Sequence, residues 1–169
     1  MRLPICLFDA KTGILCPKCE GKFKSGHLTK TDVDLSIKLS GLQVKIPELD
    51  KTTLLHALEV DGDLALVMGK GDHDILRKNH RVFRNLEKEV GRKIWVVEGE
   101  TSDRQVLEDI FFPIKILMVN VVWLPDGSKL TKVIVPGRKT KRFPLDLERA
   151  KSVVKAIRGI DLIVEFERS

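Results

Sequence analysis

Apolar and polar residues follow two periods along this chain, and together they predict an alternation of helices and strands. The clearest local pattern is a pair of apolar runs on either side of Asp61-Gly62. It predicts a β-hairpin with a type I′ turn, because both turn residues tolerate positive φ. In the first 100 residues, the first predicted element is a helix over 32–40, with Thr31 as N-cap and Asp34 at the capping-box distance. Strands over 54–60 and 63–68 and a short helix capped by Asp72 follow. The last two elements are a longer helix, with Val82, Phe83, Leu86 and Val90 on one face and Gly91 at its end, and a strand over 93–98.

The second half of the chain repeats this order with the short helix missing. Its predicted elements are a helix that is capped by Ser102 and stops at Pro113, strands over 114–124 and 129–135, a helix capped by Asp146 and closed by Gly159, and a strand over 160–166. Residues 1–28 show no useful periodicity. The sequence therefore predicts an α+β protein in three parts, residues 1–28, 29–100 and 101–169.

Composition restricts the class of protein. The chain has 169 residues, of which 43% are hydrophobic and 32% charged, so it can bury a real core. The most apolar stretch, residues 110–124, is interrupted by Pro113, Lys115 and Asn120 and is not a membrane span. No secretory signal is visible, and three cysteines do not suit a disulfide framework. We therefore expect a cytoplasmic protein without a membrane partner.

The positive charge of the chain is concentrated in two segments. The formal net charge is +6, which favours polyanionic partners. Residues 77–93 hold seven basic residues against two acidic ones, and residues 138–142 hold four basic residues in five. The alternative for the first segment is a helix face that is charged only because it faces water. The candidate nucleic-acid contacts are Arg77, Lys78, Asn79, His80, Arg81, Arg84, Lys88, Arg138, Lys139, Lys141 and Arg142.

Three stretches carry a resemblance to a known family: residues 75–98, residues 119–128 with the sequence VNVVWLPDGS, and residues 164–167. Together they resemble archaeal NusA-like KH proteins, which act as transcription elongation or termination factors. The order helix, strand, strand, helix, helix, strand is that of a type II KH domain. The resemblance implies two tandem type II KH-like modules, the second degenerate, with RNA as partner, RNA polymerase or the ribosome as a further partner, and no enzymatic activity or small-molecule substrate.

The chain departs from the KH pattern at the loop that binds nucleotides. KH domains carry Gly-x-x-Gly there, because the absence of side chains lets the backbone approach the phosphates. Residues 77–80 stand at these positions without either glycine, and residues 137–140 offer the first glycine only. Two hypotheses follow: basic side chains contact the phosphate backbone instead, or the modules have lost RNA binding and serve as a protein-docking adaptor.

The N-terminal cysteines indicate a metal site. Cys6-x₂-Asp9 and Cys16-x₂-Cys19 could bring four ligands to one ion, and the resemblance implies a zinc knuckle in which Asp9 replaces a cysteine. His27 is an alternative fourth ligand. We predict a structural Zn²⁺ held by Cys6, Asp9, Cys16 and Cys19; the alternative is a set of free thiols, with Leu3, Ile5, Phe8 and Leu15 holding the segment by packing.

Two other groups of residues have a structural explanation at this stage. Asp72, His73 and Asp74 could ligate a metal of a hydrolase, but they stand at a helix start, where aspartates cap. Trp95 and Trp123 lie inside apolar strands, so we expect both in the core and not at a base-stacking surface.

Overall fold

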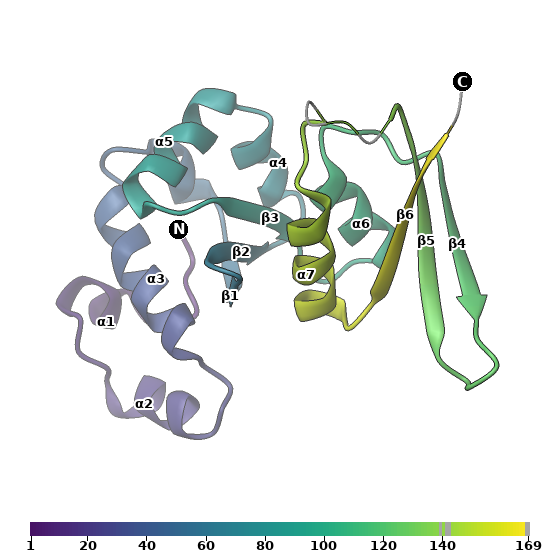
Figure 1. The fold of residues 1–169 in the computed structure, drawn as a ribbon. Helices are drawn as coiled ribbons and strands as arrows, with labels where there is room; N and C mark the ends of the chain where they lie inside the picture. The colour runs from purple at the N-terminus through teal and green to yellow at the C-terminus, as the bar shows by residue number, and fades with distance from the viewer. Residues whose placement is uncertain (139, 141–142, 168–169) are drawn as a thin grey trace. The chain divides into compact units, whose positions relative to one another are not determined.

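The computed structural model describes residues 1–138, 140 and 143–167 and has an α+β architecture. The chain forms two compact units, Met1–Glu100 and Thr101–Ser169. Each unit contains one three-stranded sheet (Figure 1). Residues 1–28 belong to the first unit. No helix of the described residues is long and apolar enough to cross a membrane.

The sheet of the first unit has the order β1-β2-β3. Strands β1 (Leu54–Val60) and β2 (Asp63–Met68) are antiparallel, and β2 is parallel to β3 (Ile94–Glu98). Asp61 and Gly62 have φ of 50° and 85°, which confirms the predicted turn. The helices are α3 (Lys30–Leu42), α4 (Asp72–Arg77) and α5 (His80–Val90), and a 3₁₀ turn, η1 (Pro47–Lys51), precedes β1. The predicted order of elements is therefore confirmed for residues 29–100.

Helix α3 starts two residues earlier than predicted. Thr29 is its N-cap: the Thr29 hydroxyl accepts from the Asp32 N–H at 3.1 Å, and the Asp32 carboxylate accepts from the Thr29 N–H at 2.9 Å. Thr31 and Asp34 offer the same spacing. Asp32 also accepts from the backbone N–H of Ala57 on β1 at 2.6 Å, and this long-range contact selects the first pair. The prediction of Thr31 as N-cap was wrong.

Helix α3 separates two apolar clusters. Its residues Leu35, Leu39 and Leu42 face the main core between the helices and the sheet. Val33 and Ile37 pack on a smaller cluster of the N-terminal segment, whose buried members are Ile5, Ala10, Cys19 and Leu28. That segment forms two short helices, α1 (Leu7–Thr12) and α2 (Pro17–Lys24), which the sequence pattern did not predict. Each is too short to show an apolar period.

The second unit has a sheet of order β4-β5-β6. Strands β4 (Met118–Trp123) and β5 (Lys129–Pro136) are antiparallel, and β5 is parallel to β6 (Asp161–Glu167). Helices α6 (Asp103–Phe111) and α7 (Leu147–Arg158) pack on the face that carries Val133, Val135 and Leu162. Ser102 and Asp146 cap the helices as predicted. Strand β4 begins at Met118, four residues later than predicted.

Candidate metal centre and basic surface

The two halves of the N-terminal segment present their ligands in the same way. Cys6 is the N-cap residue of α1 and Asp9 lies three positions later; Cys16 is the N-cap residue of α2 and Cys19 lies three positions later. Pro17 occupies the first position of α2, where a missing N–H costs nothing. The ligand atoms of these four residues all lie within 4.8 Å of one another. The predicted cluster is therefore formed, and it is close enough to hold one metal ion.

The carboxylate of Asp9 is the polar centre of this cluster. The residue is fully buried, and its Oδ2 accepts from the backbone N–H of Cys16 at 2.9 Å. Its Oδ1 is buried and has no N–H or O–H donor among the described residues. The Cys16 N–H lowers the pKa of Asp9 to about 2 despite the opposing effect of burial, and the three thiols add to the lowering. A buried anionic oxygen without a donor is the feature that a cation would satisfy.

The buried thiol of Cys19 resists ionisation. Burial raises the pKa of Cys19 to about 12, and the neighbouring Asp9 carboxylate acts in the same direction. A metal ion reverses this preference because thiolates are the ligands, so binding must release protons. Three sulfurs and one carboxylate oxygen suit a tetrahedral zinc-type site.

The sequence left two alternatives open for this segment: His27 as the fourth ligand, and apolar packing in place of metal binding. His27 is exposed, its Nδ1 lies 2.7 Å from Ser25 Oγ, and it is not part of the described cluster. The packing explanation is correct for Leu3, Ile5 and Leu15, which pack in the small apolar cluster beside α3, but wrong for Phe8, which is exposed. The segment therefore combines packed apolar side chains with the cluster of four possible metal ligands.

The loop at the Gly-x-x-Gly positions is held by contacts within the protein. The Arg77 guanidinium lies 2.8 Å from Asp74 Oδ1, and only 15% of its side chain is exposed. Lys78 Nζ lies 3.2 Å from Asp74 Oδ2. Partial burial opposes ionisation of Asp74, but the hydrogen bond from Lys78 and the charges of Arg77 and His73 lower its pKa. Asn79 accepts from the Val82 N–H and caps α5. Of the four loop residues, Lys78 and His80 are the most available to a ligand.

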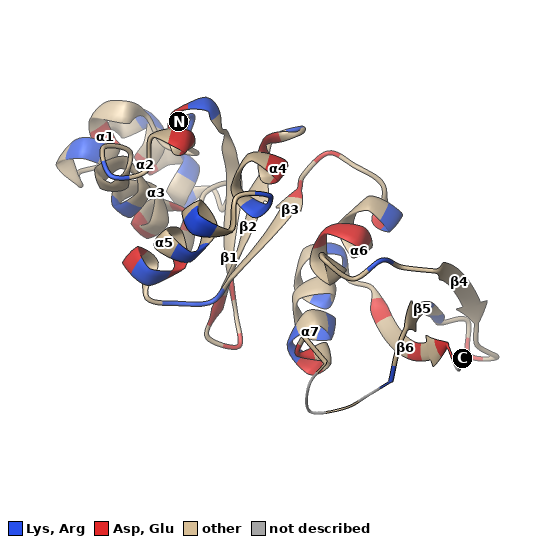
Figure 2. Ribbon diagram, turned by 90° about the horizontal axis from the view of Figure 1, so that it is seen from above, with Lys and Arg blue, Asp and Glu red and all other residues tan. Residues whose placement is uncertain are grey.

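Helix α5 is amphipathic, as the sequence predicted. Val82, Leu86 and Val90 are buried, whereas Arg81, Arg84 and Lys88 are exposed. Figure 2 shows Lys and Arg along this helix and in the turn that leads to β3. A row of positively charged side chains on the exposed face of the helix can contact phosphates without reading bases.

The end of this row lines a shallow hollow. Its lining residues are Arg84, Glu87, Lys88, Gly91, Arg92 and Lys93. Glu87 accepts from the backbone N–H of Ile94 at 3.1 Å, which fixes the turn. Arg92 and Lys93 belong to the basic segment of residues 77–93 but were not among the contacts predicted from the sequence. Their position directly after Gly91, the helix-ending glycine, was the available signal.

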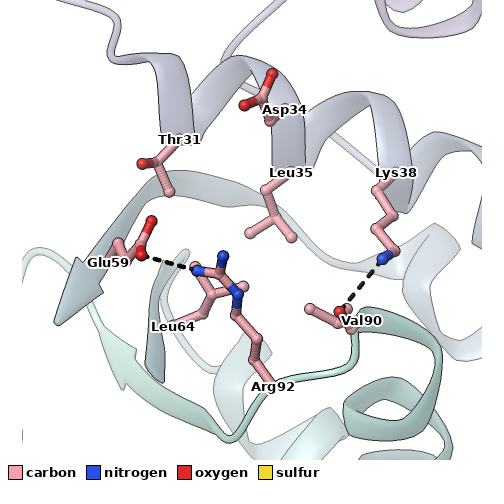
Figure 3. A pocket seen from close by; sticks show the side chains of 8 residues that line it. All are labelled: Thr31, Asp34, Leu35, Lys38, Glu59, Leu64, Val90 and Arg92. Atoms are coloured by element: carbon pink, nitrogen blue, oxygen red, sulfur yellow. Dashed lines mark hydrogen bonds and ion pairs between the residues drawn. The ribbon is translucent and has the colours of Figure 1, made fainter. Parts of the chain in front are cut away.

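Arg92 also lines a second cavity, which is shown in Figure 3. Its lining residues are Thr31, Asp34, Leu35, Lys38, Glu59, Leu64, Val90 and Arg92. Lys38 Nζ donates to the Val90 carbonyl at 3.2 Å, and Arg92 pairs with Glu59 at 3.1 Å. These contacts tie α3 and the β1–β2 hairpin to the end of α5, so they hold the basic hollow in place.

The remaining candidate residues fall into three groups. Arg138 is exposed, while Lys139, Lys141 and Arg142 lie outside the described residues. Asp72 does not cap α4: its Oδ2 accepts from the Thr53 N–H at 2.8 Å, and Gly71 is the N-cap residue. The predicted capping role was wrong because the contact with the start of β1 takes the carboxylate.

The two tryptophans differ in environment. Trp95 is buried, as predicted, and its Nε1 donates to Asp63 at 3.1 Å. Trp123 is 70% exposed, so its predicted core position was wrong. It lies at the end of β4, which has a neighbouring strand, β5, on one side only. An apolar strand sequence does not show whether the strand lies at the edge of its sheet.

Comparisons with known proteins inform the fold alone. No family model matches the chain, and no curated protein matches it. The crystal structure of APE1850 matches with a TM-score of 0.50 and 17% sequence identity, over 77% of this chain and 95% of that one. At this identity, the chain is similar to that structure in its arrangement of helices and strands.

Proposed function

We propose that the chain is an RNA-associated protein that contacts the phosphate backbone through helix α5 and the turn into β3. The observation that carries the proposal is the hollow lined by Arg84, Lys88, Arg92 and Lys93. The helix-strand order of residues 29–100 supports a KH-like module, and the sequence resemblance supports a role in transcription elongation or termination. The N-terminal cluster acts as a structural zinc site that keeps α1 and α2 packed on α3.

The positive charge that the hollow offers comes from Arg84, Lys88 and Lys93. Glu87 is held by the backbone N–H of Ile94, whereas Arg92 is paired with Glu59 and adds little net charge. Arg84 and Lys88 are exposed, and the Lys93 ammonium lies 4.4 Å from the centroid of the Trp95 ring. Contacts of this kind neutralise phosphates and release counterions, so binding should weaken steeply with salt and discriminate little between sequences.

The test is fluorescence anisotropy with a labelled single-stranded RNA across a salt series. The triple variant Arg84→Ala, Lys88→Ala, Lys93→Ala removes three charges from the hollow. A matched control, Lys11→Ala, Lys18→Ala, Lys22→Ala, removes three exposed charges from α1 and α2. We expect the hollow variant to lower the slope of log K against log salt by about 2, since each single-strand contact contributes roughly 0.7. Equal effects of both variants, or no binding at low salt, would contradict the proposal.

A protein-docking adaptor on polymerase or ribosome is the second candidate. The contacts of Arg77 with Asp74 favour it, because they withdraw from the ligand a residue at the loop that KH domains use. An adaptor would retain polymerase or ribosome in pull-downs after nuclease treatment and would bind RNA with no dependence on the hollow.

The zinc proposal is tested separately by elemental analysis of the purified protein. We expect about one zinc per chain, held by Cys6, Asp9, Cys16 and Cys19. Clearly substoichiometric metal after gentle purification would contradict it.

A further inference from the structure

Strand β4 is an unprotected sheet edge. It stands at the end of the order β4-β5-β6, and the segment from Met118 to Trp123 contains no charged residue. Its large apolar side chains are mostly exposed, with Val121 at 49% and Trp123 at 70%. Leu117, just before the strand, and Val122 are exposed as well. Figure 1 shows β4 and β5 as a long hairpin of the second unit.

The other sheet edges of the described residues carry charge. Strand β1 contains Glu59, β3 contains Glu98, and β6 contains Asp161, Glu165 and Glu167. The start of β1 is also covered by Arg2, whose N–H donates to the Thr52 carbonyl. Proteins place charges on edge strands because bare edges pair with other chains. The absence of this protection at β4 alone indicates a strand that pairs in the working state.

We propose that two copies of this chain join through antiparallel pairing of their β4 strands, which makes one six-stranded sheet. A two-fold axis perpendicular to the sheet leaves each side chain on the same face of the joined sheet. Each residue of one copy therefore pairs with a residue of the other copy whose number differs from its own by an even number or by zero. With the axis at Val121, Trp123 of one copy lies opposite Val119 of the other, and the two Val121 residues lie opposite each other. On the second face, Met118 lies opposite Leu124. Apolar side chains therefore meet on both faces of the joined sheet.

The charges that flank the strand fit this arrangement. Lys115 precedes β4 and Asp126 follows it, and both are exposed. In the antiparallel pair, Lys115 of one copy falls within one residue of Asp126 of the other, on both sides of the axis. Opposite charges near one another at both ends of the paired strands favour a second copy of this chain as the partner over an apolar peptide that lacks these charges. The contact is isologous, so it closes at two copies and does not propagate into a fibre.

The test is sedimentation velocity over a concentration series. Val121→Lys places two ammonium groups opposite each other at the axis, and Val44→Lys is the matched control, at a position that is 89% exposed between α3 and η1. We expect a concentration-dependent dimer for the unmodified chain and for the control. Val121→Lys should raise the dimer dissociation constant roughly 100-fold, because juxtaposed like charges are strongly unfavourable. Circular dichroism reports whether each variant is folded.

A second variant keeps the inference testable if Val121→Lys does not fold. Lys115→Glu lies outside the strand and brings like charges together near Asp126 of the other copy, so it should weaken the dimer while leaving the monomer folded. A chain that stays monomeric at the highest attainable concentration, or a dimer that neither substitution weakens, would overturn the inference. RNA binding through α5 is measured independently, so this result leaves the proposed function untouched.

Discussion

Replacement of Asp9 by asparagine tests whether the N-terminal cluster binds metal, because the two possibilities predict different outcomes. In a metal-free cluster the amide oxygen of asparagine still accepts the Cys16 N–H, and the substitution removes a buried negative charge. Because the pKa of Asp9 is lowered, that charge stabilises the fold, so stability should fall modestly and by the same amount with and without EDTA. In a metal site the same substitution removes the anionic ligand, and metal affinity should fall.

The size of the effect follows from the four ligands of the cluster. Structural zinc sites bind with roughly 10–16 kcal/mol in total. An even share for one ligand of four corresponds to about a 100-fold increase in the zinc dissociation constant. Asp9→Cys supplies a fourth thiolate beside Cys6, Cys16 and Cys19 in place of the carboxylate, and should bind zinc at least as tightly as the unmodified chain.

The assay is competition with a chromophoric chelator, together with thermal denaturation with and without EDTA. Asp34→Asn, at an exposed position on α3, serves as the control for the chemical change. We expect EDTA to lower the melting temperature of the unmodified chain and to remove most of the difference between it and Asp9→Asn. An Asp9→Asn chain whose loss of stability is the same with and without EDTA, and that binds zinc with unchanged affinity, would refute the assignment of Asp9 as a ligand.

Three further predictions concern the fold. Asp32→Ala removes the carboxylate that accepts from the Ala57 N–H and should lower the free energy of unfolding by about 3 kcal/mol, measured by urea denaturation. The pKa of Asp74 is below its usual 3.8, so the ionised carboxylate stabilises the fold above that pH, and this stability is lost as the pH falls through the lowered pKa. Asp74→Asn should therefore flatten the pH dependence of the free energy of unfolding below about pH 4. Acrylamide should quench the exposed Trp123 and spare the buried Trp95, so Trp123→Phe should abolish the quenchable fluorescence.

The sequence predicted the fold best where a local pattern and its tertiary surroundings agree. The Asp61-Gly62 turn and the Ser102 and Asp146 caps depend on contacts within a few residues, and all three are present. The start of α3 shows the opposite case. Two Thr-x-x-Asp pairs compete there, and the choice of Thr29 depends on a bond to β1 that no local pattern contains.

At the candidate sites too, the sequence predicted what local spacing determines and missed what tertiary contacts determine. Cysteine spacing identified the candidate metal cluster, because two short arms with equal spacing place four possible ligands together. The basic loop was harder: Arg77 looks free in the sequence, yet Asp74, three residues earlier on α4, holds it. The position of Trp123 depends on which strand lies at the sheet edge, and an apolar run does not contain that information.

The position of α3 between two apolar clusters has a consequence for how this protein can change over evolution. Val33 and Ile37 need a cover, and residues of the N-terminal segment supply it. A shortened chain that begins at Thr29 would expose these side chains and should aggregate. The exposed Cys6 could therefore be exchanged along a lineage, while Cys19, which belongs to this apolar cluster, and its apolar neighbours would have to stay apolar.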